Sequence, residues 1–284
     1  MKNKVIIDHS KCTLCENCIS VCGTRKLELK DNSIQIVENA SCILCGHCAA
    51  ICPVDAISLP DDCQMPYETK YFDENLTEIE KLLKNKRSVR EFTPKKIEKE
   101  ILGKFVYYAE KAPSSSNKRK REYIVITDEN KILELEKTVI EKFNSYKTLT
   151  SDFSRGLIGV FSKHTSKMLN SVRDTIVKMN TNFDKKDYPV FRGAPAVVFI
   201  IAPTKDMQAK DDCVISQQYM MLYAQSLGIG STIIGYAQHA HKSLEKALNI
   251  KEGYSVFSAS IFGYQKFKYK KEINFINIPK ITWY

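Results

Sequence analysis

The sequence lacks any run of 18 or more apolar residues, so we expect no membrane-spanning helix. The stretch from Met1 to Asp8 turns acidic after three apolar residues and is too short for a secretory signal peptide. Charged residues make up only 27% of the chain and apolar residues 43%, which excludes extended disorder. These features predict a folded cytoplasmic protein of one large or two medium domains.

Acidic residues are too few to balance the basic ones, because 33 Asp and Glu stand against 43 Lys and Arg, a formal charge of +10. Such an excess is typical of a lysine-rich surface, of nucleic-acid binding, or of docking to an acidic protein. The basic residues are scattered over most of the chain, so nucleic acid is not expected as a partner. An acidic electron carrier such as a ferredoxin or flavodoxin is the partner class that we favour. The run Lys118-Arg119-Lys120-Arg121 is interpreted as a solvated turn or as part of that docking face.

The ten cysteines are unevenly spread, since eight of them lie between Cys12 and Cys52. They form two runs of the pattern Cys-x2-Cys-x2-Cys-x3-Cys. Each cysteine of the first run recurs thirty positions later, as Cys12 does in Cys42. The flanking residues repeat as well, so two copies of one small unit stand in series.

This spacing suits 4Fe–4S cubes, which take one thiolate per iron. Three cysteines of one run serve one cube, and the fourth reaches the other cube. The predicted ligands are Cys12, Cys15, Cys18 and Cys52 for one cluster, and Cys42, Cys45, Cys48 and Cys22 for the other. Zinc sites use pairs of Cys-x2-Cys instead, and a disulfide framework would suit a secreted miniprotein. Residues 1–60 resemble bacterial two-cluster ferredoxins over their whole length.

A linker is expected over residues 61–75, which contain Pro66 and a polar run. Cys63 in this linker and Cys213 farther on are interpreted as ordinary thiols, and a labile redox role for Cys63 stays open. Residues 76–284 then mix helical and strand patterns, which predicts an α+β domain of ~200 residues. The expected helices cover 97–109, 129–144, 212–227 and 241–249, and the expected strands cover 123–127, 196–201 and 255–262.

Two finer expectations concern this larger domain. Thr93 followed by Pro94 is a typical N-cap and first-turn proline, so we predict that a helix starts there. Residues 145–190 are expected to contain helix and to form a lid.

Three short segments of the larger domain stand out: Arg87-Ser88-Val89-Arg90, Ala112 to Asn117, and Leu227 to Gly235. Each has an ordinary interpretation as a helix end or loop, and Gly228 fits the C-cap of a helix. Gly228-x-Gly230 is not a dinucleotide fingerprint, since the third glycine is replaced by Ile233 and a helix precedes the segment.

The order and spacing of the three segments together resemble the nitroreductase family of FMN enzymes, over roughly residues 76–284. The resemblance implies an α+β homodimer with FMN at the subunit interface. The fold class expected for the chain is therefore α+β, with a small ferredoxin-like domain followed by a nitroreductase-like FMN domain. The residues implied in FMN binding are Arg87, Ser88, Arg90, Pro113, Ser114, Ser115, Asn117, Ile233, Ile234, Gly235, Lys268 and Lys270. Of these, residues 113–117 would come from the other subunit.

The resemblance implies an FMN-dependent oxidoreductase that passes electrons between its iron–sulfur clusters and FMN. A small electrophile, such as a nitroaromatic, a quinone or an activated alkene, would be reduced by hydride transfer from flavin N5. NAD(P)H is a further candidate electron donor, and no catalytic acid or base is identified. The alternative is a redox relay or sensor that exchanges electrons with a protein partner and has no small substrate of its own.

Overall fold

The structure is a computed structural model that describes residues 5–38, 40–59, 77–151, 163–269 and 281–284. Its contacts divide the chain into two compact units. Unit 1 comprises Met1–Lys86 and Lys266–Tyr284, and unit 2 comprises Arg87–Gln265. The predicted linker with Cys63, and also Lys270, lie outside the described residues. Within the described residues, no helix is long and apolar enough to cross a membrane.

The described part of unit 1 contains two small antiparallel pairs of strands. β1 (Ile6–Ile7) pairs with β4 (Ile57–Ser58), which brings together the two ends of the cysteine-rich segment. β2 (Leu27–Lys30) pairs with β3 (Ser33–Ile36). The further elements are α1 (Asn17–Ser20), α2 (His47–Ile51) and α3 (Glu78–Asn85).

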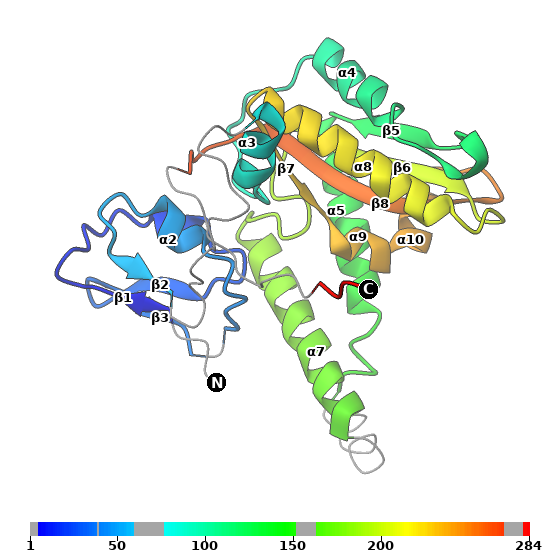
Figure 1. Cartoon of the computed structure of the whole chain (residues 1–284). Helices are drawn as coiled ribbons and strands as arrows, with labels where there is room; N and C mark the ends of the chain where they lie inside the picture. Colours follow the sequence, from blue (N-terminus) through cyan, green and yellow to red (C-terminus); the bar gives the residue numbers. More distant parts are fainter. Residues whose placement is uncertain (1–4, 39, 60–76, 152–162, 270–280) are drawn as a thin grey trace. The chain divides into compact units, whose positions relative to one another are not determined.

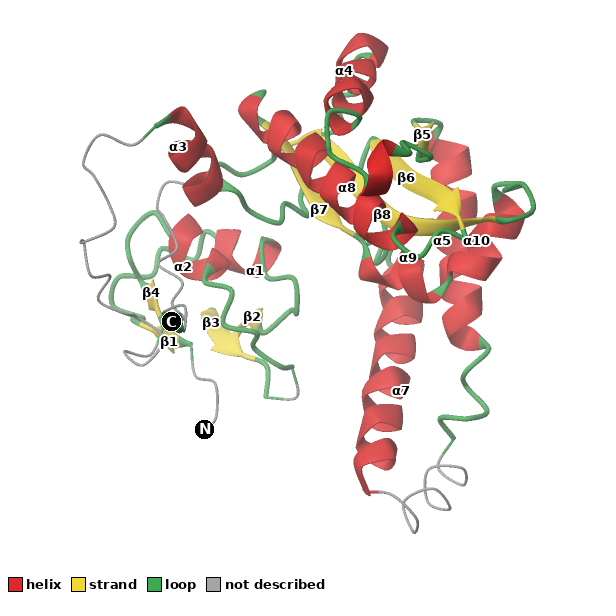
Figure 2. Cartoon of the chain, turned by 45° about the vertical axis from the view of Figure 1, so that its right-hand side comes forward, coloured by secondary structure: helices red, strands yellow, loops and turns green. Residues whose placement is uncertain are grey.

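The internal repeat is visible in the backbone as well as in the spacing of the cysteines. α1 and α2 begin thirty positions apart, each inside its cysteine run (Figure 2). Left-handed φ angles recur with the same period at Leu14 and Leu44 (57° and 52°), at Glu16 and Gly46 (57° and 66°), and at Arg25 and Asp55 (52° and 53°). The two halves therefore fold in the same way, and residues at matching positions can be compared directly.

The core of unit 1 is small and contains cysteine side chains. Val5, Leu27, Ile34 and Ile57 are buried beside Cys18 and Cys48. So small an apolar core contributes little free energy of folding, and structural metal commonly supplies the remainder in domains of this size.

Unit 2 is built on a four-stranded antiparallel sheet in the order β5-β6-β8-β7. Its strands are β5 (Glu122–Ile126), β6 (Ala196–Pro203), β7 (Ile229–Ile233) and β8 (Tyr254–Tyr264). β5 and β7 form the two edges of this described sheet, and β6 and β8 lie between them. The order matters for the site, because segments attached to β5 and to β7 are kept apart.

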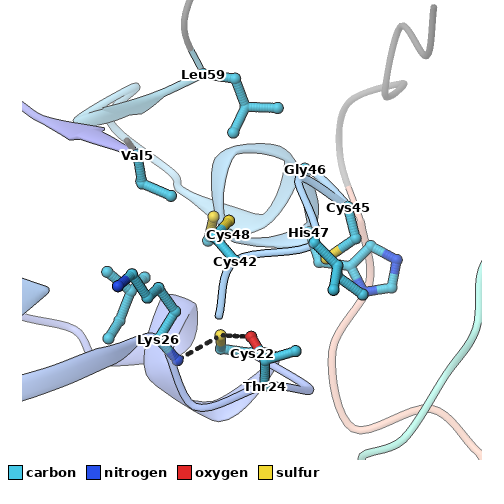
Figure 3. Close-up of a pocket in the computed structure, with 12 residues that line it drawn as sticks. Val5, Cys22, Thr24, Lys26, Cys42, Cys45, Gly46, His47, Cys48 and Leu59 are labelled. Carbon is cyan, nitrogen blue, oxygen red and sulfur yellow. Dashed lines mark hydrogen bonds between the residues drawn. The ribbon is translucent and has the colours of Figure 1, made fainter. Parts of the chain in front are cut away.

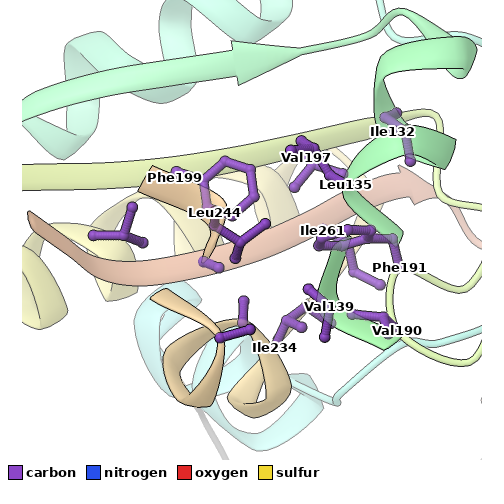
Figure 4. Close-up of a cluster of buried hydrophobic side chains, with 14 of the residues drawn as sticks. Ile132, Leu135, Val139, Val190, Phe191, Val197, Phe199, Ile234, Leu244 and Ile261 are labelled. Carbon is purple, nitrogen blue, oxygen red and sulfur yellow. The ribbon is translucent and has the colours of Figure 1, made fainter. Parts of the chain in front are cut away.

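Alternate residues of β6 pack into two different cores, because successive side chains of a strand point to opposite faces. Val197, Phe199 and Ile201 join the core on the face covered by α5 and α10 (Figure 4). Val198 and Ile200 join the core under α4 and α8. Unit 2 is therefore layered as helix, sheet and helix, with α8 on one face and α5 on the other (Figure 1).

The helices of unit 2 agree closely with the sequence pattern in most places. They are α4 (Lys99–Ala109), the 3-10 turn η3 (Ser115–Asn117), α5 (Glu129–Asn144), α7 (Lys163–Asp184), α8 (Ala209–Ser226), α9 (Gly235–His239) and α10 (His241–Ala247). α5 has the predicted bounds, and α7 is helix within the range 145–190, where helix was expected.

The predicted helix start at Thr93 was wrong. The N-cap of α4 is Glu98, and the N–H of Thr93 donates instead to the carbonyl of Tyr264 at 2.8 Å. Residues 92–93 run beside the end of β8, where Phe92 forms a bridge with Gln265. Pairing with a strand that lies far away in the sequence has overridden the local capping signal.

Candidate functional sites in the two units

Cys22, Cys42, Cys45 and Cys48 line one cavity in unit 1 (Figure 3). One cysteine of the first run therefore joins three cysteines of the second run. This is the grouping that the spacing assigns to one cluster. Lys26, Thr24 and His47 line the same cavity.

Cys12, Cys15 and Cys18 belong to the other predicted set. Their thiols are near enough for the charges of Cys12 and Cys15 to act on Cys18. Cys52, the fourth member, is buried, and its sulfur accepts a hydrogen bond from the backbone N–H of Ala56 at 3.2 Å. The matching bond in the first repeat runs from the N–H of Lys26 to the sulfur of Cys22 at 3.1 Å.

Burial controls the protonation of the inner thiols. It raises the pKa of Cys18 to about 11 and that of Cys48 to about 12, and the neighbouring cysteines add to both shifts. Protonated thiols do not bind metal, so iron must displace these protons when it binds.

The cysteine geometry differs from that of a single-ion site. Among the residues that the structure describes, no three His, Cys, Asp or Glu side chains are placed to hold one metal ion together. A cube of four irons takes one thiolate on each iron, so its ligands surround a volume and do not meet at one point.

In unit 2, the first candidate segment for FMN binding lies along β7. Ser88 forms a parallel bridge with Ser231, and the N–H of Val89 donates to the carbonyl of Ser231 at 3.1 Å. A Cβ on Gly230 would come within 2.7 Å of the Val89 side chain, so only glycine allows this approach. The structure thus brings the segment Arg87–Arg90 next to the third candidate segment.

The guanidinium of Arg90 turns back onto its own segment and donates to the carbonyl of Ser88 at 3.1 Å. Arg87 and Ser88 are half-buried. Two cationic side chains therefore stand within four residues of each other beside an edge strand. Guanidinium groups at such a place suit a bidentate phosphate contact.

The third candidate segment ends β7 and begins α9. Gly228, directly before the strand, has φ +72° and follows the C-cap of α8, as expected of a C-cap glycine. Ile233 and Gly235 are exposed. Ile234 instead points into the core, and its N–H donates to the carbonyl of Ala259 at 2.9 Å. Of the three FMN contacts predicted in this segment, Ile233 and Gly235 are therefore open to a ligand and Ile234 is not.

The second candidate segment lies before β5, at the opposite edge of the sheet. It comprises Pro113, Ser114, Ser115 and Asn117, and Ser114 and Asn117 contact Arg119. The hydroxyl oxygen of Ser114 accepts from the N–H of Arg119 at 3.0 Å, and Asn117 Oδ1 accepts from its Nε at 2.8 Å. The N–H of Ser115 donates to Asp212 Oδ1 at 3.0 Å.

Arg121 corrects the interpretation of the run Lys118–Arg121 as a solvated turn. Only 6% of Arg121 is exposed, and its guanidinium donates to the carbonyls of Ala112, Pro113 and Asp212 at 3.0 to 3.1 Å. Lys118 forms an ion pair with Asp206 at 3.1 Å. Most of this run thus serves to hold its own loop.

Lys268 is described, and its contacts place it in unit 1 with the cysteine-rich segment, whereas the other described FMN candidates belong to unit 2. Its predicted role stays a prediction. The sequence pattern missed Arg121, Asp212 and Gly230, which organise the two loops. Arg121 was hidden in a run of four basic residues, and nothing local marks which of the four is buried.

The chain belongs to the nitroreductase family, whose pattern matches residues 83–264. Residues 4–53 match the 4Fe-4S dicluster domain. The predicted fold class and the prediction of a nitroreductase-like oxidoreductase are confirmed by these matches.

Solved structures share the fold. A nitroreductase with bound FMN from Bacteroides fragilis is 21% identical, covers 74% of this chain and 100% of its own, and has a TM-score of 0.55. A nitroreductase with bound FMN from Desulfitobacterium hafniense is also 21% identical, and the match covers 74% of this chain and 100% of that one with a TM-score of 0.54. An FMN-dependent nitroreductase from Clostridium difficile is 19% identical, and the match covers 72% of this chain and 99% of that one with a TM-score of 0.53. No curated protein matches the chain.

Proposed function

We propose that the chain passes electrons between two 4Fe–4S clusters and FMN and uses them to reduce a small electrophile. The main observation behind the proposal is that one chain contains two kinds of candidate redox site. One is a cavity lined by Cys22, Cys42, Cys45 and Cys48, and the other is the pair of cationic and glycine-rich segments along β7. Clusters carry electrons singly, and bound FMN supplies the conversion to two-electron chemistry.

The donor set fits the clusters. Four thiols around one volume match the thiolates that a cube needs, and backbone N–H groups already donate to Cys22 and Cys52. Arg87 and Arg90 would hold the FMN phosphate, with Ser88 on the ribityl chain. Exposed Ile233 and Gly235 would lie along the flavin ring. The two similar nitroreductase structures with bound FMN support this choice of cofactor.

A homodimer would complete the FMN site. Residues 113–117 precede β5, while the other segments lie along β7, three strand spacings or ~14 Å away across the sheet. In a dimer, residues 113–117 of the second copy would reach the FMN site along β7, which the same residues of the first copy do not reach.

The faces of α4 and α8 suit contact with that second copy. Tyr107, Tyr108, Ile215 and Tyr219 are large side chains that stand 39–56% exposed. Aromatic residues of this kind are enriched in the cores of protein interfaces. We therefore assign this surface to the partner subunit.

The reaction needs two electrons per substrate molecule. A nitroaromatic, a quinone or an activated alkene would take up a hydride equivalent from flavin N5 and a proton from solvent. Two single-electron transfers from an acidic carrier such as a ferredoxin or flavodoxin balance one turnover, and NAD(P)H would supply both electrons at once. The chain's own contribution is to hold the substrate against the cofactor and to exclude water.

An anaerobic spectrophotometric titration of the purified full chain tests the proposal. We expect flavin absorption bands on a broad iron–sulfur shoulder, with about eight iron atoms per chain. Bleaching of the flavin by reduced ferredoxin, but not by NADH, would identify the cysteine-rich module as the entry port. Bleaching by NADH would make the protein a pyridine-nucleotide reductase. A preparation reconstituted with FMN that retains no flavin would refute the proposal.

A further inference from the structure

We infer that the two cluster sites are electrostatically unequal, and that Lys26 makes the site of Cys22, Cys42, Cys45 and Cys48 the one with the higher reduction potential. The inference rests on the proposed function for the presence of the clusters. It adds an order of potentials, and with it a direction of electron flow, that the cysteine pattern does not contain.

The internal repeat supplies the comparison. Lys26 follows Cys22 by four residues, and Ala56 follows Cys52 by four residues. Their backbone N–H groups donate to the sulfurs of these cysteines at 3.1 Å and 3.2 Å. The backbone environment of the two sulfurs is thus matched, and the side chains at this position differ in charge.

Lys26 is buried, with 8% of its surface exposed, and it lines the cavity of the four cysteines (Figure 3). Its Nζ donates to the carbonyls of Val37 at 2.6 Å and Glu38 at 3.5 Å. Carbonyl oxygens solvate an ammonium group but do not neutralise it. A buried charge is costly unless a countercharge lies near, and an iron–sulfur cluster with its thiolates is anionic.

Thr24 adds a second difference in the same direction. Its hydroxyl lies 3.8 Å from the sulfur of Cys22, within hydrogen-bonding distance for sulfur, and thirty positions later stands Val54, which has no hydroxyl. Hydrogen bonds to cluster sulfurs and nearby positive charge both favour the reduced, more negative state and raise the potential.

Exposed charges near the two sites also differ in the direction that would raise the potential of the site beside Lys26, but they affect the potential less. Arg25 in the first repeat is matched by Asp55 in the second, and both are exposed. Salt screens charges at the surface far more than buried ones. Of the charged side chains compared at these matched positions, buried Lys26 therefore contributes most to the difference in potential.

The consequence is a direction of flow within unit 1. A single electron from an external one-electron carrier would pass from the site of Cys12, Cys15, Cys18 and Cys52 to the site beside Lys26. The first site is then oxidised and the second reduced, so electrons collect at the second site before they leave the module.

The test is an EPR-monitored redox titration of the full chain and of its Lys26→Met variant, which keeps most of the length of the side chain and removes its charge. We expect two resolved midpoint potentials in the wild-type chain, and a shift of only the higher one to lower potential in the variant. Lys30→Met removes an exposed lysine of β2 and should shift neither potential. Full iron content with unchanged potentials in Lys26→Met would overturn the inference, and so would a shift of the lower potential alone.

A second pair of variants tests the inference in case the Lys26→Met protein does not fold. Thr24→Val should lower the higher potential, and the reciprocal Val54→Thr, at an exposed position, should raise the lower one. If neither variant shifts a potential while iron is retained, the inference fails even where Lys26→Met does not fold. A wild-type chain reconstituted with iron and sulfide that still binds no cluster would instead refute the proposed function, so the two failures are distinguishable.

Discussion

The carboxylate of Asp212 accepts a hydrogen bond from the backbone N–H of Ser115 at 3.0 Å, although the two residues are 97 positions apart. Asp212 stands in the first turn of α8. Arg121 reinforces the link, since its guanidinium donates to the carbonyls of Pro113 and Asp212, both at 3.1 Å. The loop proposed to reach FMN in the partner subunit is therefore fastened to α8 at two points, the carboxylate and the carbonyl of Asp212.

Replacing Asp212 by alanine is expected to weaken FMN binding about tenfold. The substitution leaves the N–H of Ser115 without its acceptor, at a cost of about 1–3 kcal/mol, and frees the loop. The dissociation constant can be measured by flavin fluorescence on the full chain after removal of FMN. Asp211→Ala, at the exposed neighbouring position, is the matched control. Equal affinities in the two variants would contradict a positioning role for Asp212.

Arg87→Ala is expected to lower the FMN content of the purified protein, because the phosphate loses a bidentate cation. The measurement is the ratio of released flavin to protein. Lys104→Ala removes an exposed cation from α4 and should leave that ratio unchanged. Wild-type flavin content in Arg87→Ala would refute the assignment of the phosphate to this residue.

Glu136→Gln is expected to destabilise unit 2 by about 1–3 kcal/mol. The buried carboxylate of Glu136 accepts the backbone N–H groups of Val190 and Phe191, both at 2.7 Å. An amide has only one acceptor oxygen, so one of these buried N–H groups would lose its partner. Thermal unfolding of the variant should be compared with that of Glu141→Gln, at an exposed position of the same helix. Equal melting temperatures in the two variants would show that the pair of bonds adds no net stability.

Tyr123 should make the stability of unit 2 sensitive to alkaline pH. Burial raises the pKa of its phenol above the ordinary value of 10, and its hydrogen bond to Glu110, 2.6 Å long, adds to the shift. The folded state then holds the proton more tightly than the unfolded state. This contribution to stability is complete below pH ~10 and is lost as the pH rises further.

The measurement for Tyr123 is the melting temperature between about pH 8 and pH 11. Tyr123→Phe should melt lower than the wild type at pH 8, because it loses the hydrogen bonds to Glu110 and Ser216. The gap should narrow as the pH rises. Tyr284→Phe, at the exposed end of the chain, should follow the wild type throughout. A gap that stays constant with pH would exclude the proposed titration.

Local patterns predicted most of the elements of the fold. The helix over 129–144 and the strands near 123–127, 196–201 and 255–262 follow from apolar periodicity, which depends only on neighbouring residues. β7 was missed because its five residues, Ile-Gly-Ser-Thr-Ile, carry few apolar side chains. It is a strand because β8 lies beside it, and no local signal reports that pairing.

The candidate sites likewise contain some residues that local spacing predicts and others that only contacts with distant segments place. Cysteine spacing is a local property that reflects the dimensions of a cube, so the sequence alone grouped Cys22 with Cys42, Cys45 and Cys48. Which cation of the run Lys118–Arg121 enters the interior depends instead on the carbonyls that meet it, and one of these belongs to Asp212, about ninety positions away.

The sequence by itself determined the cysteine repeat, the kind of redox centre that it predicts and most of the helices and strands of unit 2, because each depends on short-range spacing. Only the tertiary structure decided that Arg87–Arg90 lies along β7, that residues 113–117 stand at the other edge of the sheet, and that Lys26 lines the cavity of the cysteines. These placements arise from strand pairing and burial between distant segments, and such contacts exist only once the chain has folded.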